Sequence, residues 1–223
     1  MDTTIATLLF SVVVYGSYLL LEPSAIKAQS VGKDITISQQ ITSEISLVTS
    51  PQNVTMGAIA GISGGASFGQ TQLAVYTNNA LGFTVTLTAS SAPAMLGATG
   101  GGSISNYTPV SASIPDFAFA SNTTGQASEF GYSVSASSTS DLAQKFLDNG
   151  SACNVGSSDT GGSSSCWYNA STTATSTLNR TTSTLGSGAT STIFFRVNVP
   201  SNPAPTLPQA TYIATTTITA TLN

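Results

Sequence analysis

The residue types that most enzymes use for acid–base or nucleophilic chemistry are scarce in this sequence. The chain contains no histidine, which excludes Ser-His-Asp and Cys-His catalytic sites built from its own residues. Paired carboxylates, as in glycoside hydrolysis, stay open in principle, and the best-placed acids are Asp116, Glu129 and Asp148. Solvated turn acids are the simpler interpretation. We therefore expect no catalytic residues and no cofactor.

A calcium site is a second candidate. Asp148-Asn149-Gly150-Ser151 and Asp159 supply the oxygen ligands that Ca²⁺ prefers. An Asn-Gly pair is more simply a turn, and two thiols without histidine do not complete a zinc site. The sequence therefore predicts no metal.

The two cysteines, Cys153 and Cys166, form an even pair in a chain with an export-type N-terminus. Such a pair predicts one disulfide and an oxidising compartment. The residues between them are polar and rich in glycine, so the loop can close without strain. In the chain-entropy treatment a loop of this size contributes about 3 kcal/mol to stability.

Two kinds of candidate surface site accompany the cysteines. Trp167 and Tyr168 follow Cys166 directly, and an exposed aromatic pair is a platform for a sugar. Packing of the tryptophan against the disulfide is the commoner alternative. The acceptor pattern for N-glycosylation, N-x-Ser/Thr, occurs at Asn53, Asn106, Asn122, Asn149, Asn169 and Asn179.

The composition is typical of a protein that dissolves through hydroxyl groups more than through charge. Charged residues make up 6% of the chain, against about 25% in an average globular protein. The net charge is −4, with five lysines and arginines in total. Because nucleic-acid binding needs a basic patch, we expect no nucleic-acid partner.

The N-terminus indicates export. Residues 3–21 carry no charge, and a small residue, Ala28, follows. This pattern predicts a secretory signal over residues 1–28, although Asp2 stands where a basic residue is usual. The alternative is a retained hydrophobic helix of about 29 Å, which is long enough for a bilayer or a pilus core. Either way we expect an extracellular or cell-surface protein, with membrane contact only through residues 3–21 if they are retained.

Alternation of apolar and polar residues dominates the rest of the chain and predicts half-buried antiparallel strands. The stronger candidates are 34–48, 82–90, 130–136, 193–199 and 212–222, and the shorter ones are 54–60, 72–77 and 116–120. A short helix is predicted over 141–148. Turns are expected at 61–69, 78–79, 97–105 and 200–208 because these stretches are rich in Gly, Pro or Asn.

These elements predict an all-β fold, an immunoglobulin-like or jelly-roll antiparallel β-sandwich. The sandwich domain is expected over 49–223, with a long loop, 149–192, that carries the disulfide. Residues 29–48 form a separate N-terminal strand between the export segment and the domain.

Four sequence blocks together resemble secreted β-sandwich surface proteins of candidate-phyla (Patescibacteria) bacteria. The blocks are Thr77-Asn78-Asn79 with Gly82-Phe83, Glu129–Tyr132, 146–154 with 166–168, and Tyr212 with 217–221. The resemblance covers about 35–223 and is specific in the Cys–Trp block. It implies a surface setting and no particular mechanism.

The overall plan also resembles the sandwich subunits of extracellular filaments, in which an N-terminal strand of one subunit completes the sheet of the next. The candidate donor residues alternate along one face of the N-terminal strand and are Ile35, Ile37, Ile41, Ile45 and Leu47. The alternative is that 34–48 is the first strand of its own sandwich. The resulting hypothesis is a structural subunit that forms a homopolymer. A monomeric adhesin or carbohydrate-binding module, with glycans or a host cell surface as partner, is the second hypothesis.

Overall fold

The computed structural model describes residues 7, 10–15, 33–98, 100–119, 126–160, 165–184, 186 and 188–223. The chain divides into two compact units, Met1–Ile41 and Thr42–Asn223. Within the predicted export segment, residues 10–15 are helical and most other positions lie outside the described residues. Across the described parts of the chain, no helix has the length and apolar character needed to cross a membrane.

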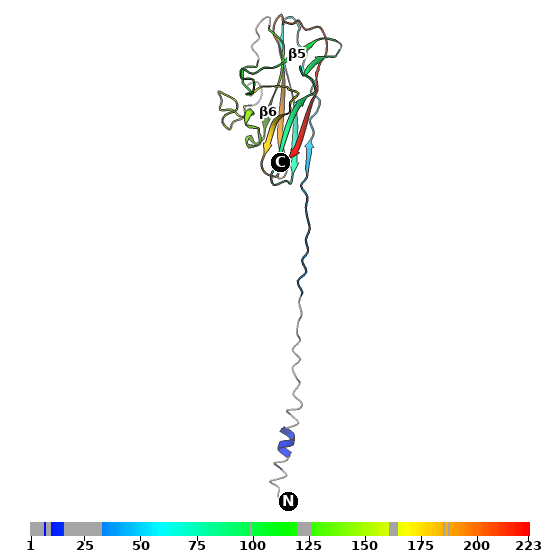
Figure 1. The fold of residues 1–223 in the computed structure, drawn as a ribbon, viewed down its shortest axis with the longest axis vertical. Helices are drawn as coiled ribbons and strands as arrows, with labels where there is room; N and C mark the ends of the chain where they lie inside the picture. The colour runs from blue at the N-terminus through cyan, green and yellow to red at the C-terminus, as the bar shows by residue number, and fades with distance from the viewer. Residues whose placement is uncertain are drawn as a thin grey trace. The chain divides into compact units, whose positions relative to one another are not determined.

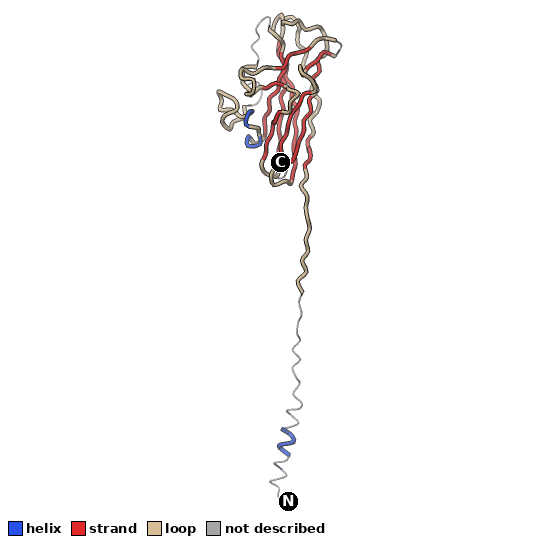
Figure 2. The backbone as a smooth tube through the Cα atoms, viewed as in Figure 1, coloured by secondary structure: helices blue, strands red, loops and turns tan. Residues whose placement is uncertain are grey.

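The second unit is a β-sandwich, which confirms the predicted fold class (Figures 1 and 2). In the larger sheet the strands follow the order β1 (Ile45–Thr49), β2 (Gly65–Thr77), β9 (Ala189–Val199), β6 (Glu129–Ala136), β5 (Ser103–Asn106), β4 (Met95–Gly97), β10 (Tyr212–Ala214). A short strand, β7 (Tyr168–Asn169), also pairs with β6. The smaller sheet has the order β11 (Thr216–Leu222), β3 (Phe83–Ala89), β8 (Thr175–Arg180). Pairings are antiparallel except between β5 and β6.

The core lies between the two sheets and is built by the predicted alternation. Phe83, Val85, Leu87 and Ala89 of β3 are buried, and Ile193, Phe195, Val197 and Val199 of β9 are buried opposite them. Each such side chain contributes about 1.5–3 kcal/mol through removal of apolar surface from water. The strong period-two segments therefore became strands because one face of each meets the other sheet.

Two of the predicted short strands are wrong, and a third is longer than expected. Residues 54–60 and the described part of 116–120, residues 116–119, form no strand beyond isolated bridges at Ala60 and Asp116. The predicted strand 72–77 begins earlier, at Gly65, inside the predicted turn 61–69. A Cβ at Gly69 would lie 2.2 Å from Cγ1 of Val54. The glycine-rich half of β2 is therefore a strand whose inner face is covered by residues 54–59 instead of by its own side chains.

The region 139–192 also differs from the prediction. The helix expected over 141–148 is two separate 3₁₀ turns, Thr139–Asp141 and Gln144–Phe146. The expected loop 149–192 contains β7, β8 and the start of β9. In β8, Thr175, Thr177 and Leu178 are buried. The strand was missed because buried threonines replace the apolar residues that the alternation rule counts, and a register shift interrupts its pairing with β3.

The C-terminal strand is divided between the two sheets. The predicted strand 212–222 is split at Thr215 into β10 and β11. β10 pairs with β4 in the larger sheet, and β11 pairs with β3 in the smaller one. The change of sheet places the last strand of the chain at an edge of the sandwich.

Candidate functional site

The first candidate site is the side of the sandwich where β1 and β11 lie near each other (Figure 1). Each of these strands is the end strand of its sheet, with β2 as the neighbour of β1 and β3 as the neighbour of β11 in the described pairings. An end strand presents unpaired N–H and C=O groups along its outer side. This side of the sandwich can therefore accept another strand.

The apolar residues at this side are incompletely covered. Ile45 and Leu47 of β1 and Ile218 and Ala220 of β11 face the core but are only partly buried. Their counterparts on the inner strands β3 and β9 are almost fully buried. An added apolar strand would remove the remaining exposed surface from water. We call this feature the β1/β11 edge.

The segment that precedes β1 carries matching apolar residues. Residues 33–44 have no regular secondary structure, and the side chains of Ile35, Ile37 and Ile41 are 81%, 90% and 83% exposed. All three isoleucines occupy odd positions, so an extended backbone would place them on one face. Such a segment has the pattern of a half-buried strand, and it has no strand partner among the described residues.

The junction between this segment and β1 is held by the side chain of Asn78, which lies in the turn after β2. The backbone N–H of Glu44 donates to Oδ1 of Asn78 at 2.7 Å, and Nδ2 of Asn78 donates to the carbonyl of Thr42 at 3.0 Å. Asn78 thus holds residues 42–44 in place of a β ladder.

The predicted donor strand is therefore corrected at one end. Ile45 and Leu47 lie in β1 and pair with Thr77 and Val75 of β2, as the first strand of their own sandwich. The donor hypothesis narrows to Ile35, Ile37 and Ile41. The sequence alone did not separate the two parts because the alternation continues across both.

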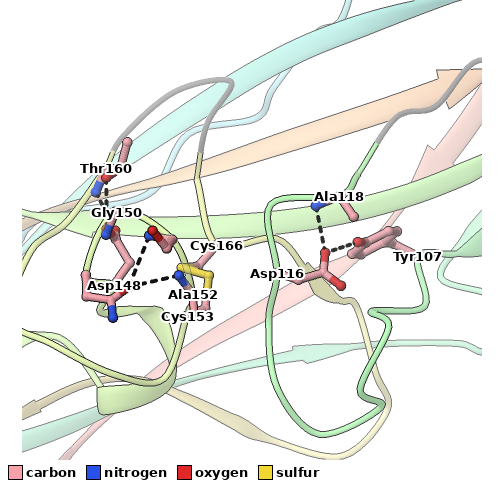
Figure 3. Close-up of a disulfide and its surroundings, with 11 residues drawn as sticks. Tyr107, Asp116, Ala118, Asp148, Gly150, Ala152, Cys153, Thr160 and Cys166 are labelled. Atoms are coloured by element: carbon pink, nitrogen blue, oxygen red, sulfur yellow. Dashed lines mark hydrogen bonds between the residues drawn. A yellow bond between two sulfur atoms is a disulfide. The ribbon is translucent and has the colours of Figure 1, made fainter.

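The predicted disulfide is confirmed. Cys153 and Cys166 are bonded, and both are buried. A buried disulfide is consistent with an oxidising, extracytoplasmic environment. Figure 3 shows the bond between two loop systems, one organised by Asp148 and the other by Asp116.

Both of these acids bind backbone groups. The carboxylate of Asp148, which is fully buried, accepts hydrogen bonds from the N–H of Gly150 at 2.8 Å and from the N–H and hydroxyl of Thr160. The carboxylate of Asp116 accepts from the hydroxyl of Tyr107 and from the N–H groups of Val110 and Ala118. Burial and the hydrogen bond to Asp116 raise the pKa of the Tyr107 hydroxyl. Each carboxylate therefore holds its loop together.

The oxygens of the candidate calcium ligands also accept hydrogen bonds from the protein. In addition to the hydrogen bonds that Asp148 accepts, Oδ2 of Asp159 accepts one from the N–H of Ala136 at 3.0 Å. Oδ1 of Asn149 accepts from the N–H groups of Ser151 and Ala152. These acceptors are turned toward donors of their own loop and, for Asp159, of the end of β6. Burial raises the pKa of Asp159.

An open hollow of about 530 Å³ lies beside the disulfide. Its lining comes from two loops and includes Val110, Ile114, Pro115, Phe117, Ala152 and Cys153. Asp116 also lies in the wall, where its carboxylate already accepts three hydrogen bonds.

Glu129, the third acid, differs because it is half-buried. Burial raises the pKa of its carboxyl group above the ordinary 4.5, the charge of Asp116 adds to the rise, and a backbone hydrogen bond from Thr108 opposes it. The folded state therefore holds the Glu129 proton at pH values where the unfolded chain has lost it. This group's contribution to stability is present below pH 4.5 and is lost as pH rises through the folded-state pKa.

We expect Glu129→Gln to raise the melting temperature at pH 7 and to leave it unchanged near pH 4, because the amide keeps the shape and removes the cost of a half-buried charge. Circular dichroism melts between pH 4 and pH 8 measure the difference. Asp34→Asn, on the exposed segment, is the control for removal of one acid. An equal gain at both pH values would contradict the assignment to ionisation.

The predicted aromatic platform is corrected by the structure. Trp167 is 0% exposed and packs with Tyr107, Phe119 and Phe194 in a second cluster on the outer side of the larger sheet. The disulfide belongs to the main core. Tyr168 is half-buried, edge-on to Tyr132 and Phe146, with Nζ of Lys145 4.5 Å from its ring centre. Trp167 therefore offers no ring surface to a sugar.

The predicted glycosylation sites divide into three groups. Asn53, Asn149 and Asn179 are exposed. The amide of Asn106 binds the N–H of Ala94 and the carbonyl of Ala170, and Oδ1 of Asn169 is buried. Asn122 lies outside the described residues. The first group is therefore the accessible one.

The chain matches no protein-family model, and a comparison with curated proteins finds no significant relative.

Proposed function

We propose that this protein is a non-enzymatic structural subunit of an extracellular filament or surface layer. In this proposal, residues 35–41 of one copy add to the β1/β11 edge of the next copy. The observation that carries the proposal is the coexistence, in one chain, of an unpaired row of exposed isoleucines and an incompletely covered strand edge. The isoleucines lack an apolar surface to cover them, and the edge lacks a strand to pair with it.

The two partners agree in length. Residues 35–41 would span about 23 Å when extended, and β11 also contains seven residues. A paired strand of this length replaces water at the backbone groups of the edge by a ladder of hydrogen bonds. The register along the edge is then set by which isoleucine meets Ile218 or Leu47.

The free-energy gain of the proposed contact is of the same size as the cost of association. Burial of three isoleucine side chains contributes about 1.5–3 kcal/mol each, and each net backbone hydrogen bond contributes about 0.5–1.5 kcal/mol. Together these offset an association cost of about 4–15 kcal/mol. The low charge of the chain, 6% charged residues, also leaves little repulsion between copies.

The test is polymer formation by a triple variant, Ile35→Ser/Ile37→Ser/Ile41→Ser. We expect the wild-type protein to form regular polymers in negative-stain micrographs and to sediment as large species. The triple variant should stay monomeric, because its segment can no longer bury apolar side chains at the edge.

The matched control replaces three other exposed aliphatic residues, Ile62, Leu81 and Val110, by serine. These side chains are 77%, 66% and 87% exposed and lie outside both the segment and the edge. The control should polymerise like the wild type. Polymers of the Ile35/Ile37/Ile41 variant, indistinguishable from wild-type polymers, would sink the proposal.

A second candidate function, a carbohydrate-binding surface protein, is favoured by a different observation. Phe68 and Tyr76 lie on the outer face of β2, at 48% and 42% exposure. Exposed aromatic rings on a flat sheet are suited to stacking against sugar rings. The residues that support this function are not the predicted Trp167 and Tyr168.

A further inference from the structure

The outer face of the larger sheet carries a row of exposed side chains along β2. Phe68, Gln70 and Gln72 occupy alternate positions on this face and are exposed, and Tyr76 is exposed beyond the buried Ala74. The two aromatic residues are eight positions apart, which is about 26 Å. The uninterrupted part of the row, from Phe68 to Gln72, spans about 13 Å.

Next to this row lies a guanidinium group in an aromatic cage. Arg196 of β9 is paired across the ladder with Phe68 on β2 and with Gly131 on β6. The Cζ atom of Arg196 lies 4.8 Å, 5.2 Å and 5.8 Å from the ring centres of Phe68, Phe119 and Trp167. The rings hold the cation by its interaction with their faces.

Gly131 makes this cage possible. A Cβ at this position would lie 3.0 Å from Cβ of Tyr107 and 3.4 Å from the ring of Phe119. The missing side chain lets the aromatic cluster lie directly on β6, beside Arg196.

Arg196 keeps hydrogen-bonding capacity that the described residues do not use. The ion pair found among them is Arg180–Asp141, so no carboxylate of the described residues forms an ion pair with Arg196. Its Nε is buried without a partner, as are Nε1 of Trp167 and Oδ1 of Asn198, the latter in a residue only 3% exposed on the same strand. A planar fork of donors in partly desolvated surroundings is the group that binds a carboxylate most strongly.

We propose that Arg196 and Phe68 form a binding site for the carboxylate and ring of a hexuronate unit in an acidic glycan. This inference rests on the second candidate function and is independent of polymerisation. The guanidinium pairs with the carboxylate, the exposed face of Phe68 stacks on the sugar ring, and the amides of Gln70 and Gln72 meet hydroxyls of adjacent units.

A sugar fits this face better than an acidic peptide does. Arg180 and Lys145 lie on other elements, and Lys33 lies in the N-terminal unit. The face also carries Glu129, which is paired with Asn198 in the ladder and half-buried. Besides Glu129, the face offers one cation, two neutral amides and an exposed ring, and these match a ligand that combines a carboxylate with hydroxyls and a C–H face.

The test measures binding of the full chain, kept in a non-ionic detergent, to polygalacturonate and to the same polymer with its carboxyl groups methyl-esterified. We expect binding to polygalacturonate and at least tenfold weaker binding to the ester, because the ester cannot pair with Arg196. Arg196→Gln should weaken polygalacturonate binding about tenfold or more, and Phe68→Ala about threefold to tenfold. Lys145→Gln is the control, because it also removes one positive charge that lies over an aromatic ring, that of Tyr168. It should change binding less than twofold.

The outcomes separate this inference from the function on which it rests. Equal binding of both polymers, unaffected by Arg196→Gln, overturns the acidic site and leaves carbohydrate binding intact. Equal binding of polyglutamate with the same dependence on Arg196 overturns the assignment to a glycan. Binding to none of the polymers overturns both the site and the second candidate function. Melting temperatures of the variants within a few degrees of wild type show that a loss is not due to unfolding.

Discussion

Replacement of Trp167 by alanine is expected to destabilise the domain by about 3–5 kcal/mol. The indole is fully buried between loop 107–119 and the outer face of the larger sheet, with Phe119 at 5.4 Å and Phe68 at 6.3 Å between ring centres. Removal leaves a cavity between loop 107–119 and the outer face of the sheet. Denaturant unfolding followed by circular dichroism measures the loss.

The matched control is Phe68→Ala. Phe68 belongs to the same group of rings but is 48% exposed, so we expect a clearly smaller loss of stability. A change below 1 kcal/mol for Trp167→Ala would contradict the buried placement. Trp167 also forms one wall of the Arg196 cage. Because its ring is buried and cannot touch a ligand, a loss of ligand binding in Trp167→Ala would mean that the ring positions Arg196.

The sequence predicted the strands whose apolar residues come from the strand itself. In β3 and β9 every second side chain enters the core, so the alternation is complete. The predicted boundaries of β3 agree within one residue, whereas β9 ends as predicted but begins earlier, at Ala189. In the first half of β2 the inward positions include Ser67, Gly69 and Thr71. Val54 and Met56 cover that part of the strand from a loop. Local alternation cannot show side chains supplied by a distant segment.

The candidate site was predicted in part for a similar reason. The exposed isoleucines at 35, 37 and 41 are visible in the sequence because they alternate. Their proposed acceptor is not visible, because the β1/β11 edge exists only once the chain changes sheets at Thr215. Asn78 was noted in a turn motif, but its hold on residues 42–44 depends on the pairing of β1 with β2. For Trp167 the sequence left an exposed platform and packing against the disulfide as alternatives. The side chain is buried, but in a cluster with Tyr107 and Phe119, because a distant loop that the local sequence does not reveal covers it.

The two proposed surfaces are compatible within one molecule. The β1/β11 edge uses the narrow side of the sandwich, and the Arg196 site uses the outer face of β2 and β9. A strand added at the edge extends a sheet sideways and leaves its outer face uncovered. A filament of such subunits would repeat the Arg196 face once per copy, and linked copies bind a repeating glycan more tightly than a single copy does.

Removal of the disulfide in Cys153→Ala/Cys166→Ala is expected to lower the free energy of unfolding by about 3 kcal/mol. The bond closes a loop of sequence separation 13, and without it the unfolded chain gains the freedom of that loop. The loss has a local consequence too, because Cys153 pairs through its backbone with Asp148, which also pairs with Ser158. We expect the Asp148 loop to exchange its amide hydrogens faster in the variant, while β3 and β9 stay protected.

The wild-type protein provides the control for this experiment. When it is unfolded and refolded with reductant, its stability should fall to that of the double-alanine variant, and the variant itself should not respond to reductant. In the folded state both sulfurs are buried, so reduction without denaturant should be slow. A double variant as stable as the oxidised wild type would show that the loop is already ordered in the unfolded chain or held by the Asp148 hydrogen bonds alone. The disulfide would then form because the compartment is oxidising and would not stabilise the fold.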